Sequence, residues 1–315
     1  MFLAEDIVGL DIGENAVAAT RVKRRGASEY EIRTAGVLEC RTGMPERELA
    51  ALIRSLWRTC RMPSRTVCSC LHGRTLVLRY FKYPSLSPAE FRSAAMLDAE
   101  ESLQLPQSDI AADWHLNAAT PASESGSPTG MEGMLVAAPA RDVTAHLTLL
   151  RLAGLYPVAL DARPMAVCDL FCALGGRHQP QETVCLVHLT RLSADIAIVF
   201  ETRGVYARTV YSRSASWDES PEYLIENVSD VLKFYQFKLR QEPVSRLVCA
   251  GLAPARHRLL EQLSERTGMA AETWDPLDHM TIRSERVRRA LKAGRDAGSA
   301  FIASLGLALR RTESE

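Results

Sequence analysis

The sequence lacks the features that would place the chain across a membrane or on nucleic acid. No apolar run approaches the roughly 18 residues of a membrane-spanning helix, and the N-terminus has neither the basic start nor the long apolar stretch of a signal peptide. Lysine plus arginine equals aspartate plus glutamate at 38 each, so the formal net charge is zero. This balance gives no support to nucleic-acid binding or to general adhesion to acidic lipid. We therefore expect a cytoplasmic protein that binds no nucleic acid.

Motifs of common hydrolases and metal enzymes are also missing. The seven histidines have no HExxH or triad-like context, and no serine lies in a G-x-S-x-G turn. The eight cysteines are scattered through apolar segments of a long chain, which is typical of buried reduced thiols rather than of a disulfide framework. We therefore predict no catalytic residues from these motifs.

One cysteine cluster has two interpretations. Cys68, Cys70 and His72 alternate along a predicted strand, so all three would face one side and could hold zinc. However, C-x-C-x-H has no paired second cluster, and a buried or half-buried strand face explains the same alternation. We predict that no metal is bound.

What the sequence does contain is an ordinary globular composition, with 47% hydrophobic and 24% charged residues. At 315 residues the chain is long enough for two lobes that share one interface. Apolar spacing predicts alternating helices and strands. Between Pro45 and Pro63, apolar side chains recur at i, i+3, i+4, i+7 and i+8, which indicates a helix that covers a sheet.

Ser87-Pro88-Ala89-Glu90 is a capping box, so a helix should run from Pro88 to about Gln104. Further helices are predicted at 141–152, 164–174, 222–240, 254–267 and 298–310. Strands are predicted at 17–22, 30–38, 67–81 (as one strand or as two divided at Gly73), 110–116, 134–138, 158–160, 183–189, 195–201, 205–210, 244–250 and 270–274. Residues 117–133 are rich in small and polar residues and predict a surface loop.

The N-terminal stretch 7–25 predicts a β-hairpin with a tight turn. Asp11, Gly13, Glu14 and Asn15 lie in or beside this turn. Backbone N–H groups of such a turn could bind an anion, glycine would let a phosphate approach, and Asp11 could orient a hydrated magnesium ion. A plain hairpin without a ligand would have the same pattern.

The second half of the chain repeats the plan of the first. Each half opens with a strand hairpin and then lays helices on a sheet. This repetition predicts a duplicated α/β fold with a cleft between two lobes, 1–175 and 181–315, joined by a hinge at Gly175–Gln181.

Four stretches resemble a known family. VGLDIG at 8–13 resembles the first phosphate loop of the actin-like ATPases, which include actin, the Hsp70 ATPase domain, sugar kinases and FtsA. Residues 79–106, 134–161 and 298–310 more specifically resemble PilM-like type IV pilus assembly proteins. The resemblance implies a two-lobed actin-like fold, of the duplicated ribonuclease H-like kind, with a small subdomain inserted in the first lobe at about 83–155.

The nucleotide site of that family is only partly matched. Its second phosphate loop has the pattern Asp-x-Gly, whereas this chain has His188 and Thr190. An imidazole cannot replace a carboxylate that holds a magnesium-bound water, and Thr190 brings a β-carbon where the backbone must pass close to phosphate. The glycine pair of the adenosine loop is reduced to Gly251, followed by Leu252. We expect weak or absent binding of ATP and magnesium, no turnover, and no other cofactor.

The resemblance also implies a function. PilM-like proteins lie at the cytoplasmic face of the inner membrane, bind the cytoplasmic N-terminal segment of PilN and contact other pilus assembly proteins. The peptide groove lies between the first subdomain and the insert, and here we assign to it Leu78, Tyr80, Phe81 and Tyr83. An apolar groove would suit an extended peptide that adds to a sheet edge. For each of the four taken singly, an ordinary core or turn residue is the favoured interpretation.

Three alternatives remain open. The first is an actin-like kinase or ATPase, which is disfavoured by His188, Thr190 and Leu252. The second is an FtsA-like membrane-tethered polymer, which would end in a polar linker and an amphipathic helix, whereas this chain stops at Glu315 soon after its predicted last helix. The third is the cytoplasmic domain of a GspL-like type II secretion protein, which would continue into a membrane span. We favour a scaffold of a type IV pilus or of a related pseudopilus or secretion system.

Overall fold

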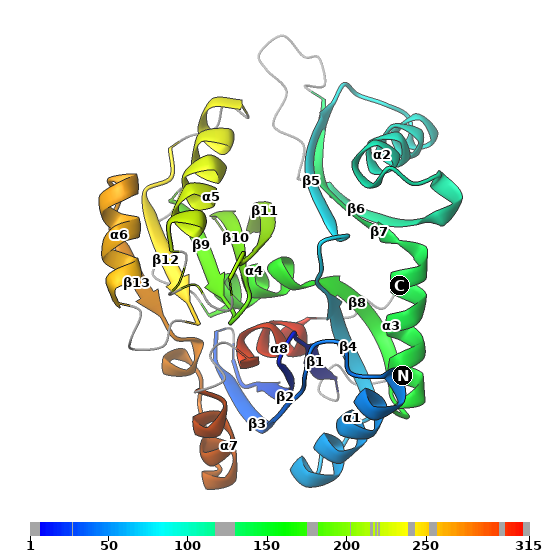
Figure 1. The fold of residues 1–315 in the computed structure, drawn as a ribbon, viewed down its shortest axis with the longest axis vertical. Helices are drawn as coiled ribbons and strands as arrows, with labels where there is room; N and C mark the ends of the chain where they lie inside the picture. Colours follow the sequence, from blue (N-terminus) through cyan, green and yellow to red (C-terminus); the bar gives the residue numbers. More distant parts are fainter. Residues whose placement is uncertain are drawn as a thin grey trace.

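The computed structural model describes residues 7–26, 28–116, 130–174, 182–201, 203–214, 217, 219, 221–238, 243–251, 257–295 and 300–310. These residues form two five-stranded sheets and one three-stranded sheet, with helices packed against them (Figure 1). Along the vertical long axis of Figure 1, the first five-stranded sheet lies in the lower part of the molecule and the other two sheets lie in the upper part.

The first sheet has the strand order β3-β2-β1-β4-β8. Its strands are β1 (Val8–Ile12), β2 (Ala16–Arg24), β3 (Tyr30–Glu39), β4 (Thr66–Leu71) and β8 (Tyr156–Ala162). The first three are antiparallel neighbours, and β4 and β8 continue the sheet in parallel. Helices α1 (Glu46–Cys60) and α3 (Ala140–Leu152) bury one face with Ile53, Leu56 and Leu150, as their apolar stripes require.

The second sheet repeats this plan with the order β11-β10-β9-β12-β13. Its strands are β9 (Thr183–Leu189), β10 (Ser193–Phe200), β11 (Arg203–Tyr211), β12 (Arg246–Ala250) and β13 (Ala271–Trp274). Helices α5 (Pro221–Lys233) and α6 (His257–Thr267) bury its outer face. A π-helical turn, Phe234–Lys238, follows α5. The matching strand orders confirm the predicted duplicated α/β fold.

The third sheet is small and has the order β5-β7-β6. Its strands are β5 (Val77–Tyr83), β6 (Ile110–Leu116) and β7 (Met131–Pro139), and helix α2 (Pro88–Leu103) packs on it. The predicted capping box is present, because the Ser87 amide donates to the Glu90 carboxylate and Ser87 Oγ accepts from the Glu90 amide. A short 3₁₀ turn, Gln107–Asp109, leads into β6.

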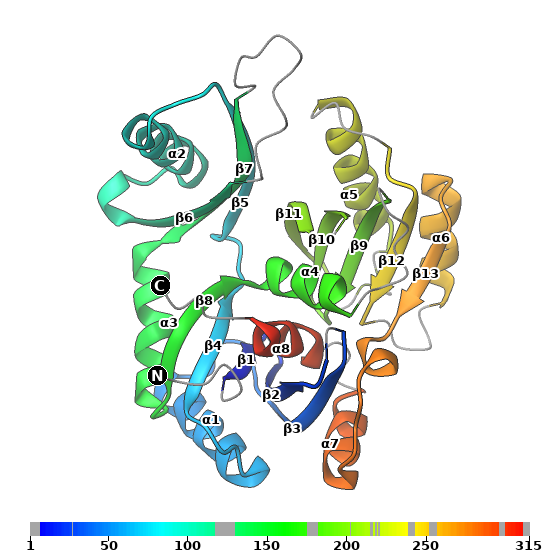
Figure 2. The ribbon, with the colours of Figure 1, turned by 180° about the vertical axis from the view of Figure 1, so that it is seen from behind.

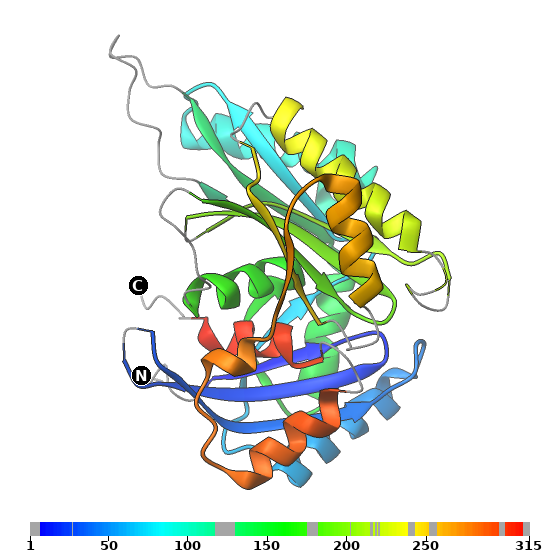
Figure 3. The same cartoon turned by 90° about the vertical axis from the view of Figure 1, so that its left-hand side faces the viewer.

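Helices α4 (Arg163–Ala173) and α8 (Ala300–Leu309) form two layers between the five-stranded sheets (Figures 2 and 3). Helix α8 was expected in the second lobe, but it packs on β1, β2 and α4. Its residues are buried on every side, which explains why a polar face is missing from its sequence. A side chain at Gly306 would overlap the Ala166 carbonyl, so glycine permits the close approach of α4 and α8.

The stretch 67–81, for which one or two strands were predicted, forms two strands, β4 and β5, which belong to different sheets. The structure corrects other details of the predicted organisation. Strand β5 begins before the expected insert at 83, whereas α3, inside the expected range 83–155, packs on the first sheet. Strand β7 begins at Met131, inside the predicted loop 117–133, whose residues 117–129 lie outside the described part of the chain.

Near the C-terminus, a 3₁₀ turn at Pro276–His279 and helix α7 (Glu285–Arg295) were not predicted. Helix α7 packs along β3 through Val287 and Leu291. The predicted hinge, Gly175–Gln181, lies wholly outside the described residues, which end at 174 and resume at 182. In the described part of the chain, no helix is both long and apolar enough to cross a membrane.

Candidate functional site

The turn between β1 and β2 has the tight backbone that the sequence predicted. The Gly13 amide donates to the Ala16 carbonyl at 2.9 Å, and the Asn15 carbonyl accepts from the Cys40 amide at 3.0 Å. Asp11 lies at the end of β1 with 6% of its surface exposed and accepts a hydrogen bond from Cys70 Sγ. Asp11 is enclosed, whereas the side chain of Glu14 extends beyond this turn.

Glu14 extends to the turn between β9 and β10 in the second half of the molecule. Ser193 Oγ donates to Glu14 Oε1 at 2.8 Å, and Thr190 Oγ1 lies 3.5 Å from Glu14 Oε2. Arg163 Nη1 lies 3.4 Å from Oε1. Burial alone would raise the pKa of Glu14, but Arg163, His72 and the Ser193 hydrogen bond together lower it below the usual value. The Glu14 carboxylate is therefore charged and bonded across the interface of the two halves.

The β9–β10 turn is closed by its own side chains. The Thr190 amide donates to the Ser193 carbonyl at 2.8 Å, and the Ser193 amide donates to Thr190 Oγ1 at 2.9 Å. The Thr190 carbonyl accepts from the buried Trp217 indole at 3.1 Å. Hydroxyl side chains therefore occupy the concave side of this turn, where a phosphate-binding turn needs free amides.

Arg163, the first residue of α4, has no exposed surface and joins both turns. Its Nε donates to Asp195 Oδ2 at 2.8 Å, its Nη2 lies 3.3 Å from Asp195 Oδ1, and Nη2 also donates to Ser193 Oγ at 2.7 Å. Asp195 accepts further hydrogen bonds from Thr209 Oγ1 at 2.7 Å and His188 Nδ1 at 3.1 Å. This is a bidentate ion pair, the strongest kind of charge-assisted contact.

The ionisation of this pair follows from its geometry. Burial alone would raise the pKa of Asp195, but Arg163 and the His188 hydrogen bond hold it well below the usual value for aspartate. Burial alone would lower the pKa of Arg163, whereas Asp195, Glu14 and Asp11 raise it well above its ordinary value. Both groups are therefore charged, and each depends on the other for its solvation.

The two turns are in direct contact in this arrangement. Ser193 Oγ and Glu14 form a hydrogen bond across them, so a ligand that entered between the turns would have to replace it. Two carboxylates of the cluster, Glu14 and Asp195, are both engaged by Arg163. The imidazole of His188 is buried, and its Nε2 has no hydrogen-bond partner among the described residues.

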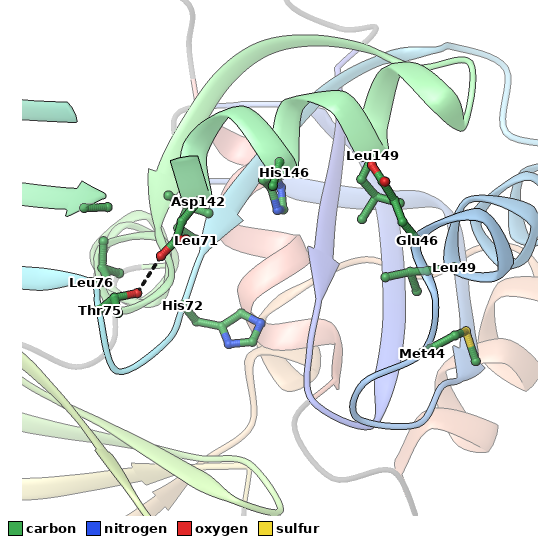
Figure 4. A pocket seen from close by; sticks show the side chains of 12 residues that line it. Met44, Glu46, Leu49, Leu71, His72, Thr75, Leu76, Asp142, His146 and Leu149 are labelled. Carbon is green, nitrogen blue, oxygen red and sulfur yellow. Dashed lines mark hydrogen bonds between the residues drawn. The ribbon is translucent and has the colours of Figure 1, made fainter. Parts of the chain in front are cut away.

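A cavity of about 480 Å³ lies on the other side of the β1–β2 turn, between the start of α1, the end of β4 and α3 (Figure 4). Apolar side chains of Leu49, Leu71 and Leu149 line it, with Glu46 and Asp142 at the first turns of α1 and α3. The full lining is Met44, Glu46, Leu49, Leu71, His72, Thr75, Leu76, Ala138, Asp142, Ala145, His146 and Leu149.

The polar groups of this cavity are held in place. Thr75 Oγ1 donates to Asp142 at 2.8 Å, which links α3 to the segment that leads into the third sheet. His146 Nε2 lies 2.9 Å from Ser69 Oγ, and burial lowers the pKa of His146 to about 4. His72 Nε2 donates to the Ile12 carbonyl at 2.5 Å. The cavity therefore combines an apolar floor with two carboxylates and a neutral imidazole.

Comparisons with known proteins give a fold. No family model matches the chain, and no curated protein does. A solved structure described as the PilM-PilN type IV pilus biogenesis complex aligns with a TM-score of 0.79 and 20% identity, over 97% of this chain and 98% of that one. A Bacteroides thetaiotaomicron protein with an actin-like ATPase fold and unknown function aligns with a TM-score of 0.53 and 8% identity, over 92% and 96%.

The fold is actin-like. This agrees with the predicted fold class and with the repeated strand order of the two five-stranded sheets. The two hairpin turns joined by Glu14 and Arg163 are the two turns that the sequence analysis compared with phosphate loops. The third nucleotide element is incompletely described: Gly251 follows β12 with a left-handed φ of 77°, and Leu252 lies outside the described residues.

The four residues assigned to a peptide groove do not lie together on one surface. Phe81 is 3% exposed and packs in the core under α2, so it cannot line a groove here. The phenol of Tyr80 donates to Glu132 at 2.5 Å, and that of Tyr83 donates to Asp98. Leu78 lines a different cavity of about 450 Å³, between β5 and the second sheet.

The remaining sequence-predicted ligands are also placed. Cys68 and Cys70 are buried, and burial raises the pKa of the Cys68 thiol to about 11 and that of the Cys70 thiol well above its ordinary value. The imidazole of His72 lies beside the β1–β2 turn. Arg163, Ser193 and His146 were not singled out from the sequence. The available signal was an arginine at the start of a mostly apolar helix, since a buried charge there needs a partner.

Proposed function

We propose that this protein is a scaffold of type IV pilus assembly, or of a related pseudopilus or secretion machine. It works at the cytoplasmic face of the inner membrane and binds the cytoplasmic N-terminal peptide of a PilN-like membrane protein. The observation that supports this proposal is the alignment with the PilM-PilN structure over nearly the full length of both chains.

The cavity between α1, α3 and the end of β4 is the proposed peptide site. It lies where the first sheet meets the segment that leads to the third sheet, and its floor is apolar. A peptide with an apolar anchor residue would bury that side chain against Leu49, Leu71 and Leu149. A lysine or arginine beside the anchor would meet Glu46 and Asp142.

We propose further that the protein is a pseudo-ATPase, with weak or absent ATP binding. His188 and Thr190 replace the groups that a magnesium nucleotide requires, and the hydrogen bond between Ser193 and Glu14 closes the space for phosphate. Scaffold activity therefore depends on binding partners rather than on hydrolysis.

Calorimetric titration tests both parts. The purified protein is titrated with a synthetic peptide of the N-terminal segment of a PilN-like protein from the same genome, and separately with MgATP. We expect peptide binding and no heat from MgATP. Ala145→Trp fills the cavity and should weaken peptide binding by about tenfold or more. Thr144→Trp, at an exposed position of α3 outside the cavity lining, should leave it unchanged.

Two results would contradict the proposal. If the peptide fails to bind, or binds Ala145→Trp as tightly as the unchanged protein, the cavity is not the partner site. Micromolar binding of MgATP without peptide binding would instead favour an actin-like ATPase or an FtsA-like polymer.

A further inference from the structure

We propose that Arg163 takes over the bridging role of a nucleotide, because it ties the two phosphate-loop positions to each other and keeps the two halves of the molecule closed without any ligand. This inference deepens the pseudo-ATPase part of the proposed function and rests on it. It is independent of which peptide the scaffold binds.

Arg163 is anchored to the second half of the molecule, by which we mean the second five-stranded sheet and the helices on it. In the chain, Arg163 comes before that sheet, at the start of α4. The guanidinium is fully buried and pairs with Asp195 through Nε and Nη2. A buried guanidinium cannot be hydrated, so it requires partners for its donors. Asp195 also accepts hydrogen bonds from Thr209 and His188, which fix the position of its carboxylate. Arg163 is therefore held firmly to the β9–β10 hairpin.

Arg163 contacts the first half of the molecule through Glu14. Glu14 is carried by the β1–β2 turn, and its side chain is 12% exposed. It faces Ser193, Thr190 and Arg163, all of which come from α4 or the second hairpin. With little water to compete, a charged carboxylate in this position attracts the second half directly. Glu14 is therefore the first half's attachment point.

The cluster lies at the start of α4, one of the two helices packed between the five-stranded sheets. Arg163 begins α4, and α4 packs on α8, which in turn packs on β1 and β2. The backbones of α4 and α8 approach closely at Gly306. The two halves are thus joined by the helix pair, and the Glu14–Arg163–Asp195 cluster closes the edge where the two turns meet.

The consequence for ligands is direct. A phosphate that entered between the turns would have to separate Ser193 from Glu14 and would meet two carboxylates, Glu14 and Asp195. Its gain from Arg163 would be offset by the loss of the existing bidentate pair. Closure is therefore a property of this chain alone, and a nucleotide does not add to it.

Hydrogen exchange on the full chain tests this inference. Arg163→Ala would leave the Asp195 carboxylate buried without its counter-ion and could unfold the protein, so Glu14→Gln is the informative variant. It keeps the size of the side chain and the Arg163–Asp195 pair and removes the charge that joins the halves. The matched control is Glu48→Gln, since Glu48 pairs with Arg41 at the same 3.4 Å but on an exposed surface.

We expect exchange in the segments 12–16 and 190–194 to be about tenfold faster in Glu14→Gln than in the unchanged protein. Glu48→Gln should change it by less than about twofold. MgATP at millimolar concentration should leave the exchange of the unchanged protein as it was. The inference is overturned if Glu14→Gln behaves like Glu48→Gln, or if MgATP slows exchange at the two turns.

The outcome is separable from that of the proposed function. Loss of peptide binding in the calorimetric titration, with fast exchange in Glu14→Gln, would reject the scaffold and leave the Arg163 bridge. Peptide binding with unchanged exchange in Glu14→Gln would reject the bridge and leave the scaffold.

Discussion

The two hairpin turns occupy equivalent places in sheets of the same strand order, but they are built differently. The β1–β2 turn is tight and is closed by a backbone hydrogen bond at Gly13, and the side chain of Glu14 extends from it to the other turn. The β9–β10 turn is filled by the hydroxyls of Thr190 and Ser193. A duplicated fold therefore preserves strand order without preserving the chemistry of its loops. In this chain the second turn receives a carboxylate from the first, where a phosphate-binding turn would receive the ligand.

The two turns also differ in how strongly they hold Arg163. Asp195 makes a bidentate pair, and neither partner's side chain is more than 1% exposed. Glu14 contacts one nitrogen at 3.4 Å and keeps 12% of its side chain exposed. The second half thus holds the cation, and the first half is attached to it. This asymmetry makes the two carboxylates experimentally distinguishable.

The largest expected effect comes from Asp195→Asn. Removal of this charge leaves the Arg163 guanidinium buried without its main counter-ion, and we expect the free energy of unfolding to fall by about 3 kcal/mol. Glu14→Gln should lower it by about 1 kcal/mol, because Glu14 makes the longer contact and is partly hydrated. Urea denaturation of both variants measures the difference. Equal losses would show that the two halves hold Arg163 alike.

A smaller effect is expected where the halves share the α4–α8 helix pair. Gly306→Ala places a methyl group against the Ala166 carbonyl, which forces the helices apart, and we expect a loss of about 2 kcal/mol. Gly26→Ala is the matched control, because a methyl there meets only the Glu29 side chain at ordinary contact distance. If both substitutions have the same effect in thermal unfolding, the close approach of α4 and α8 does not matter for stability.

The smallest expected effect is the contribution of His146, in the first half, to the pH dependence of the free energy of unfolding. Burial lowers the pKa of His146 to about 4 in the folded state, below the usual value of about 6.5 in the unfolded chain. The unfolded state therefore binds more protons, and this stabilising contribution is present above pH 6.5 and lost as the pH falls towards 4. Between pH 7.5 and 5.5 we expect a loss of about 1 kcal/mol that His146→Gln does not show.

The comparison with His146→Gln is necessary because another group acts in the opposite direction. Burial raises the pKa of Asp169 to about 6, so its contribution is lost as the pH rises through that value. Asp169 is present in both proteins, and its contribution cancels in the difference. Identical pH profiles for the two proteins would show that His146 is not buried in its neutral form.

Local patterns predicted most of the secondary structure. The apolar stripe at Ile53 and Leu56 and the capping box at Ser87 each combine a period with a start signal, and both helices formed as expected. Helix α7 was missed because Val287 and Leu291 are almost its whole stripe in a strongly charged segment. The burial of α8 follows from its composition, whereas the sheet that it packs on is decided by tertiary packing, where β1 passes close to α8 at Gly9.

Only the part of the candidate site that lies in the β1–β2 turn could be predicted from the sequence. Asp11, Gly13 and Glu14 were located in a turn because a hairpin has a local signature. Arg163 is 149 residues from Glu14 in the chain, so no local pattern could pair them. The Phe81 assignment failed because an alternating strand does not reveal which face a helix will cover.

The most direct test of the account is the thermal unfolding of the unchanged protein with and without millimolar MgATP. If the halves are joined by Arg163 and not by a nucleotide, MgATP should leave the midpoint of thermal unfolding the same within about 1 °C. A nucleotide that bound the folded state at a hundred times its Kd would stabilise it by about 2.7 kcal/mol and raise the midpoint by several degrees. Such a rise would contradict the account.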